Sequence, residues 1–159
     1  MSRYDWLLFL HITSGLAFFA AYTIVSAVLI AGQRTASAAT VRALLRLTRP
    51  ADVLAWIGAT GTLVFGIWLV VDLDAYQLWD GWVVGAFALW LVAEEVIRRE
   101  DLFFKRARRI ARATHAGARQ RTDDVPVALR SRHTLVMHVF GSLALLGMLF
   151  LMIFKPGAV

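Results

Sequence analysis

Four long apolar stretches constrain the fold of this 159-residue chain more than any other feature of its sequence. A helix needs about 20 apolar residues to cross a bilayer. Lipid offers no hydrogen-bond partner to a free backbone group, so a segment that crosses it must be helical. We therefore predict an all-α protein, a bundle of four transmembrane helices over about 6–31, 53–73, 79–98 and 134–154. The third stretch is the shortest, and it reaches spanning length only with Trp79 or Arg98.

The composition agrees with a membrane protein and excludes several other classes. Hydrophobic residues make up 59% of the chain and charged residues only 18%, whereas soluble proteins have roughly half and a quarter. Cysteine is absent, which excludes disulfides, iron–sulfur clusters and thiol nucleophiles. The first stretch is too long to be the apolar core of a cleaved signal peptide. We expect one membrane domain over residues 1–159.

The segments that join the stretches differ sharply in charge. Residues 32–52 carry a net charge of +3 and residues 98–133 a net charge of +7, whereas residues 72–81 hold three aspartates and no basic residue. Positively charged loops stay in the cytoplasm. We therefore expect both basic loops inside and both termini outside, in a bacterial cytoplasmic membrane. The high isoelectric point then reflects topology, and no nucleic-acid partner is indicated.

Each basic loop is expected to be partly helical. In the first, a short helix over about 36–47 would end before Pro50. In the second, apolar residues at helical spacing reach toward Gly117, so either the third helix continues or a separate helix lies on the inner leaflet. A turn is expected over 122–126. Anionic lipid headgroups are the expected partners of six arginines: Arg42, Arg46, Arg49, Arg106, Arg109 and Arg112.

Two histidines lie inside the predicted spans, where ionisable residues usually have a function. His11 is near the outer surface and His138 is near the inner one, so their depths differ by roughly 16 Å. That separation excludes the pair as ligands of one haem iron. His11 alone is a candidate haem or metal ligand. The alternative, favoured for both residues, is a histidine that is hydrogen-bonded to a neighbouring helix.

Two adjacent carboxylates, Glu94 and Glu95, end the third span. Arg98 and Arg99 follow them at i+4, the favourable order on a helix, so interfacial salt bridges are the simplest interpretation. Adjacent helix positions point about 100° apart. One carboxylate would then face the bundle interior and bind protons or cations, as in a small transporter or channel.

Small residues recur every four positions in the second span, at Gly58, Thr62 and Gly66. Such spacing lets another helix approach closely, and it favours helix packing, in a homo-oligomer or a membrane complex. The chain has no phosphate-binding loop, no nucleophile elbow and no zinc-protease motif. The sequence therefore predicts no catalytic residues.

Three short motifs carry a resemblance to a known family. They are Leu10-His11-Ile12 in the first span, Thr60-Gly61 in the second and Lys155-Pro156 after the last. Together they resemble a bacterial family of small predicted integral membrane proteins of unknown function. The layout is also similar to the CopD-like copper-resistance domain and the HemJ-like protoporphyrinogen oxidases. These resemblances imply haem or metal handling with His11 as a ligand, whereas residues 82–97 contain no lysine or histidine.

Three functions follow from these observations. The favoured one is a non-catalytic scaffold or accessory subunit that packs through helix–helix contacts, and it predicts a tightly packed bundle. The alternative is a membrane redox protein that binds a metal or a b-type haem through His11, and it predicts a cavity beside that residue. The second alternative is a small transporter or channel that uses Glu94 or Glu95. An enzyme is less favoured than any of these.

Overall fold

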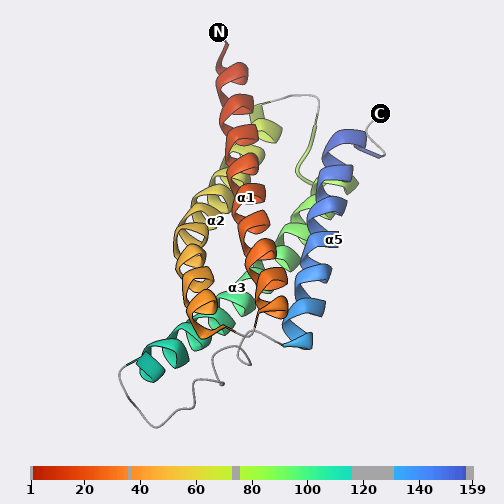
Figure 1. Cartoon of the computed structure of the whole chain (residues 1–159). Helices are drawn as coiled ribbons and strands as arrows, with labels where there is room; N and C mark the ends of the chain where they lie inside the picture. Colours follow the sequence, from red (N-terminus) through yellow and green to blue (C-terminus); the bar gives the residue numbers. More distant parts are fainter. Residues whose placement is uncertain (1, 36, 73–75, 116–130, 157–159) are drawn as a thin grey trace.

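The computed structural model describes residues 2–35, 37–72, 76–115 and 131–156, which form four helices. They are α1 (Arg3–Arg34), α2 (Ala38–Asp72), α3 (Gly81–His115) and α5 (Arg132–Phe154) (Figure 1). The prediction of an all-α, four-helix fold is confirmed. The expected turn over 122–126 lies outside the described residues, as does the expected helix end at residue 117.

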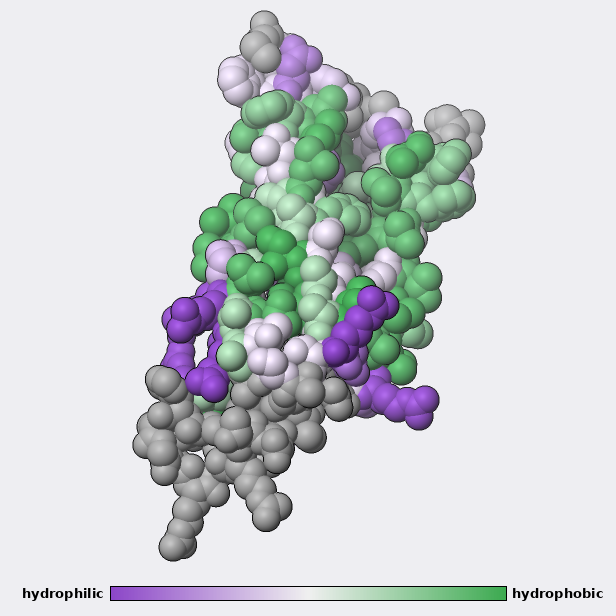
Figure 2. Space-filling view, viewed as in Figure 1, coloured by the Kyte–Doolittle hydropathy of each residue, from purple (hydrophilic) through white to green (hydrophobic). Residues whose placement is uncertain are grey.

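Within those ranges, α1, α2 and α5 are long and apolar enough to cross a membrane. Helix α3 is not one of these candidate spans, because Glu94, Glu95 and Arg98 interrupt its apolar segment. Large apolar side chains face outward along the bundle, with Trp56 71% exposed. Figure 2 shows this apolar surface over the middle of the molecule, with hydrophilic residues nearer its two ends. A surface of this kind is stable in lipid and not in water.

Helix α2 differs from the prediction. A short helix that ends before Pro50 was expected, but α2 runs unbroken through Pro50 to Asp72. Proline in a helix interior removes a backbone hydrogen bond and costs about 3 kcal/mol. Packing offsets this cost, because Val41 and Leu45 in the first turns of α2 are buried in an apolar cluster with α1 and α3. The ribbon of α2 curves along its length (Figure 1).

Helix α3 also extends well beyond the predicted span, since it continues through the basic segment to His115. From Ala93 onward, α3 has one buried face, whose residues are spaced three or four positions apart, as helical geometry requires. These buried residues are Ala93, Val96, Glu100, Phe104, Ala107 and Ala111. One of the six is a carboxylic acid, and it lies between apolar neighbours on either side.

The helices pack as two pairs. Helix α1 packs along α2, and α3 packs along α5, while α2 makes a smaller contact with α3. In Figure 1, α3 crosses behind α1 from the side of α5 to the side of α2. Helix α1 begins and α5 ends at the same end of the bundle (Figure 1). At this end the start of α3 lies beside α5 and away from α2 (Figure 1).

The α1–α2 contact is close at Gly58. A Cβ atom placed on Gly58 would lie only 2.5 Å from the backbone nitrogen of Phe18. The two backbones therefore touch at this point, and only glycine fits. This surface of α2 is covered by α1 of the same chain.

Candidate functional site

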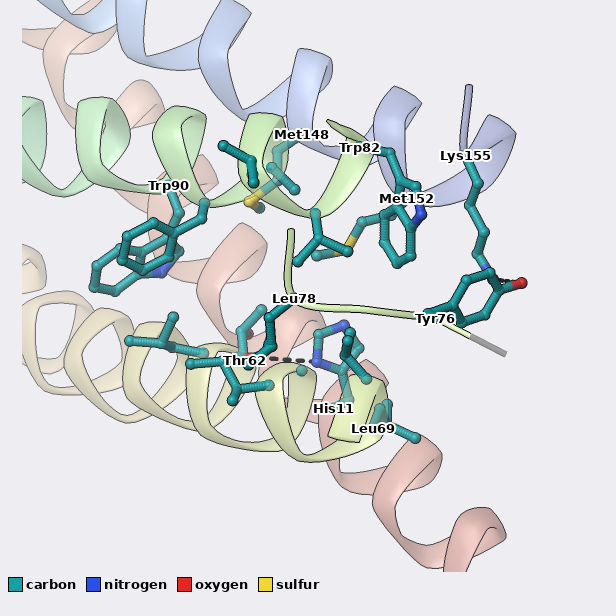
Figure 3. Close-up of a pocket in the computed structure, with 18 of the residues that line it drawn as sticks. His11, Thr62, Leu69, Tyr76, Leu78, Trp82, Trp90, Met148, Met152 and Lys155 are labelled. Atoms are coloured by element: carbon teal, nitrogen blue, oxygen red, sulfur yellow. Dashed lines mark hydrogen bonds between the residues drawn. The ribbon is translucent and has the colours of Figure 1, made fainter. Parts of the chain in front are cut away.

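A cavity of about 440 Å³ lies between the two helix pairs, at the end where α1 begins and α5 ends. Its volume is within the range of about 300–1,000 Å³ typical of small-molecule sites. Most of its wall is apolar. The residues that carry chemistry are His11, Thr62, Tyr76, Trp82, Trp90, Met148, Met152 and Lys155 (Figure 3).

The His11 ring is held by helix α2. Its Nδ1 lies 3.0 Å from the carbonyl oxygen of Thr62. A carbonyl only accepts, so Nδ1 carries the proton and donates it, and Nε2 keeps a free lone pair. In the part of the chain that the structure describes, no hydrogen bond to Nε2 is present. Figure 3 shows the ring at the cavity wall, with the Thr62 bond on one side.

Gly66 provides the space for this ring. A Cβ atom at Gly66 would lie 2.9 Å from Cε1 of His11, which is closer than carbon atoms approach without a bond. The helical spacing of Thr62 and Gly66 therefore has a local explanation. Thr62 supplies the acceptor through its backbone, and Gly66 supplies the room.

Two indole N–H groups at the cavity have no acceptor. Nε1 of Trp82 and Nε1 of Trp90 are buried, and neither has a hydrogen-bond partner among the described residues. A buried donor without an acceptor costs about 1–3 kcal/mol, so native proteins rarely leave one. Both side chains line the cavity. Two donors in the cavity wall are therefore left unsatisfied by the described residues, and the nitrogen atoms themselves are not exposed to the cavity.

A cation lies at the mouth of the cavity. Nζ of Lys155 donates to the Tyr76 hydroxyl at 3.1 Å and lies 4.4 Å from the centre of that ring. It also lies 5.5 Å from the centre of a Trp82 ring. Lys155 has a left-handed backbone, with φ of 40°, at the end of α5. Over the described ranges it forms no ion pair with a carboxylate, so its charge is available to an anion.

Two thioethers from α5, those of Met148 and Met152, line the side of the cavity that faces His11 (Figure 3). Thioether and imidazole are ligands that iron and copper accept. In the described residues no group of three or more His, Asp or Glu side chains is arranged to hold a metal ion. The donor set at this cavity is therefore one imidazole with thioethers opposite.

His138 lies in a different environment and does not line this cavity. Its Nδ1 lies 2.8 Å from Oε1 of Glu100, and its Nε2 lies 2.7 Å from Oγ of Ser26. The Tyr22 ring stacks on it at 4.4 Å, and the Tyr22 hydroxyl donates to the His138 carbonyl at 2.7 Å. His138 and Glu100 are only 7% and 4% exposed. We call these four residues the inner polar cluster; it joins α1, α3 and α5.

Of the two i+4 salt bridges expected at the end of the third predicted span, Glu95–Arg99 is present and Glu94–Arg98 is not. Glu95 binds both Arg98 and Arg99, at 2.8 and 2.7 Å. The expected Glu94–Arg98 pair is therefore wrong, because Arg98 reaches the carboxylate three residues back instead of four. Glu94 is half-buried and forms no ion pair in the described ranges. Neither carboxylate lines the cavity.

The six predicted lipid-binding arginines do not form one group. Arg49, Arg109 and Arg112 line a second hollow together with Lys105 and Arg108. The other three predicted residues, Arg42, Arg46 and Arg106, do not line it.

Several residues of these sites were missed in the sequence. Glu100 was counted among the charges of a loop, although its spacing from Val96 and Phe104 places it on the buried face of one helix. Trp82 gave no sign of a cavity, because an aromatic residue at the end of a span usually marks the membrane interface. Lys155 was noted only as part of a terminal motif. The methionines carried no signal, because thioethers in an apolar span look like ordinary core residues.

Comparison with known proteins gives one match, which covers residues 5–156. The family is described as a predicted integral membrane protein (DUF2269). No curated protein and no solved structure matches the chain. The similarity to CopD-like and HemJ-like proteins therefore stays a prediction. The chain is a multi-pass integral membrane protein, and it belongs to the DUF2269 family of unknown function.

Proposed function

We propose that this protein binds a b-type haem in the cavity between the two helix pairs, with His11 as the residue that would hold it through Nε2. The observation that carries the proposal is the hydrogen bond from Nδ1 of His11 to the Thr62 carbonyl. Histidines that bind metals usually donate their other N–H to a carbonyl or carboxylate, which fixes the tautomer and the ring orientation. Here that bond is formed, and the second nitrogen is left free beside an apolar cavity.

The rest of the cavity suits a porphyrin better than a bare metal ion. Its walls are mostly apolar and aromatic, and among the described residues no cluster of three ionisable ligands accompanies His11. Lys155 lines the cavity and is the residue expected to bind the carboxylates of an amphipathic ring. Met148 and Met152 are the candidates for a second protein ligand. A bound haem would supply one-electron transfer, so the protein would act as a membrane redox protein.

The membrane orientation is part of the same proposal. The cavity is lined by Tyr4 and Lys155, so it lies at the end of the bundle where α1 begins and α5 ends (Figure 1). The excess of basic residues in 32–52 and 98–133 supports a cytoplasmic location for the other end. The haem would then lie in the outer half of the bacterial cytoplasmic membrane.

A scaffold or accessory subunit is the second candidate. The close contact at Gly58 supports a protein whose small residues serve packing. In this chain, however, that surface is covered by α1 and is not free for another protein. A transporter or channel has less support, because neither Glu94 nor Glu95 lines the His11 cavity.

The test is an optical spectrum of the protein purified in mild detergent from cells that were fed a haem precursor. We expect a Soret band that shifts on reduction and is lost in His11→Ala. His133→Ala is the matched control, since His133 is an exposed histidine at the start of α5, and it should keep the full band. Met148→Leu and Met152→Leu test whether a thioether also holds the haem, in which case the visible spectrum should change while the Soret band is kept.

The opposite result is also decisive. If the folded protein is colourless and does not take up added haemin in a titration, the haem proposal is wrong. A haemin titration that is unchanged by His11→Ala would remove His11 as the ligand.

A further inference from the structure

The second hollow, of about 400 Å³, lies between α2 and the second half of α3, and it shares no lining residue with the His11 cavity. All five of its lining residues are cationic: Arg49, Lys105, Arg108, Arg109 and Arg112. Figure 2 shows hydrophilic side chains around an opening on this side of the molecule. Helix α2 contributes one of them and α3 the other four, so the hollow exists only because α3 continues past the predicted span.

One of these side chains is fixed in place. Arg108 is only 12% exposed, and its guanidinium lies 3.1 Å from Asp52 and 3.4 Å from Asp101. It also donates to the hydroxyl of Thr48, which is fully buried. A guanidinium held on several sides keeps its remaining N–H groups at fixed positions. Arg108 is therefore a rigid donor at the base of the hollow.

The remaining charges of the hollow are not balanced by the residues that the structure describes. Lys105 pairs with Asp101, but Arg49, Arg109 and Arg112 form no ion pair with any described residue. Like charges that are held around one small hollow repel each other. An anion that entered the hollow would relieve this repulsion, and planar guanidinium groups bind phosphate oxygens with paired hydrogen bonds.

We propose that this hollow binds a phosphate group, and that the group belongs to the headgroup of an anionic phospholipid. The second part rests on the surface next to Arg49. Val53 follows Arg49 at i+4, on the same face of α2, and is 60% exposed. Ile57 follows Val53 at the same spacing and is 64% exposed. A lipid phosphate in the hollow would thus have an apolar strip beside it for its acyl chains, which a soluble phosphate does not need.

The site is more specific than a diffuse attraction of basic residues to the membrane surface. Diffuse attraction depends on charge and not on position, so any two exposed arginines would contribute about equally. A built site depends on the residues that line it. This difference defines the experiment.

The measurement is native mass spectrometry of the detergent-purified full chain, titrated with phosphatidic acid and, in parallel, with phosphatidylcholine. The test variant is Arg109→Gln with Arg112→Gln. The control is Arg46→Gln with Arg106→Gln, which removes the same charge from exposed arginines outside the hollow. We expect the test variant to bind phosphatidic acid about thirtyfold more weakly, and the control to change by less than about threefold. Thermal unfolding of both variants verifies that they are folded.

Two results overturn the proposal. Equal loss of binding in the test variant and the control means diffuse attraction without a site. A protein that binds phosphatidic acid no better than phosphatidylcholine has no anion site at all. A competition with millimolar inorganic phosphate then identifies the source of the phosphate group. Retention of the bound lipid supports the phospholipid, and displacement of the lipid by free phosphate overturns the assignment to a lipid.

Discussion

The two buried histidine environments differ in how completely their polar atoms are partnered. His11 has one ring nitrogen bonded to a carbonyl and the other facing a cavity. His138 has both ring nitrogens bonded, a tyrosine ring stacked on it and a carboxylate beside it. Both lie within helices that are apolar enough to cross a membrane.

This difference separates structure from ligand binding. A polar group buried in an apolar medium is stable only when its hydrogen bonds are made. The inner polar cluster makes them within the chain, so it stabilises the contact of α1, α3 and α5 and leaves nothing for a ligand. Among the described residues, the His11 cavity leaves one imidazole nitrogen without a partner, and two indole N–H groups in its wall have no acceptor. The haem proposal rests on this difference.

The largest expected effect of a single substitution is that of His138→Ala. The change leaves the carboxyl group of Glu100 buried without its partner, and breaking a buried pair in this way costs about 3–5 kcal/mol. We expect the midpoint of thermal unfolding in mild detergent to fall by roughly 6–20 °C. His133→Ala is the control and should leave the midpoint unchanged. A drop of less than about 2 °C in His138→Ala would mean that the inner polar cluster does not hold the helices together.

A smaller effect is expected for Tyr22→Phe, which keeps the ring stacked on His138 and removes only the hydroxyl. The lost hydrogen bond to the His138 carbonyl is worth about 1 kcal/mol, because that carbonyl still accepts from Ser142 at 2.9 Å. The free energy of unfolding measures this directly. Tyr4→Phe, at an exposed tyrosine, is the matched control. A loss as large as that of His138→Ala would assign the cluster's stability to the tyrosine instead of to the Glu100–His138 pair.

The helices could be predicted from the sequence because their signal is local. Four apolar stretches of spanning length define where the chain is helical in lipid, whatever the neighbours are. The continuation of α2 through Pro50 could not, since it depends on Val41 and Leu45 packing against other helices. The local preference of proline predicts the end of a helix at Pro50, but tertiary packing of the first turns of α2 outweighs that preference.

The sites were predictable only in part for a similar reason. His11 stands out because an ionisable residue in an apolar span is rare. The cavity beside it is built from four separate segments of the chain, and its volume depends on how the helix pairs diverge. Glu100 was hidden by the charges around it, since counting charge in a loop ignores helical position. Extending the helical spacing of the apolar residues from Val96 to Phe104 would have placed Glu100 on their buried face.

His11→Ala is the direct counterpart of His138→Ala. It removes one hydrogen bond beside an existing cavity, and the Thr62 carbonyl is left next to open space instead of packed core. We expect the free energy of unfolding of the haem-free protein to fall by less than about 1 kcal/mol. Thermal unfolding of the two alanine variants in parallel sharpens the comparison. If both lose the same stability, His11 is as structural as His138, and the distinction between the two regions fails.

The smallest effect on stability is expected for Trp82→Phe, where two contributions to the free energy of unfolding nearly cancel. The change removes a buried N–H that has no acceptor, which favours the folded state, and it also removes part of a packed ring, which disfavours it. The two contributions are each of the order of 1–3 kcal/mol, so we expect the haem-free protein to change by less than about 1 kcal/mol. Binding should respond differently, because the indole lines the cavity and contacts Lys155, which is expected to bind a carboxylate of the ligand. Haemin affinity should then fall about tenfold, whereas Trp56→Phe, at an exposed tryptophan, should change neither quantity. If Trp82→Phe lowers stability by several kcal/mol and leaves haemin affinity unchanged, the indole is a core residue and does not serve ligand binding.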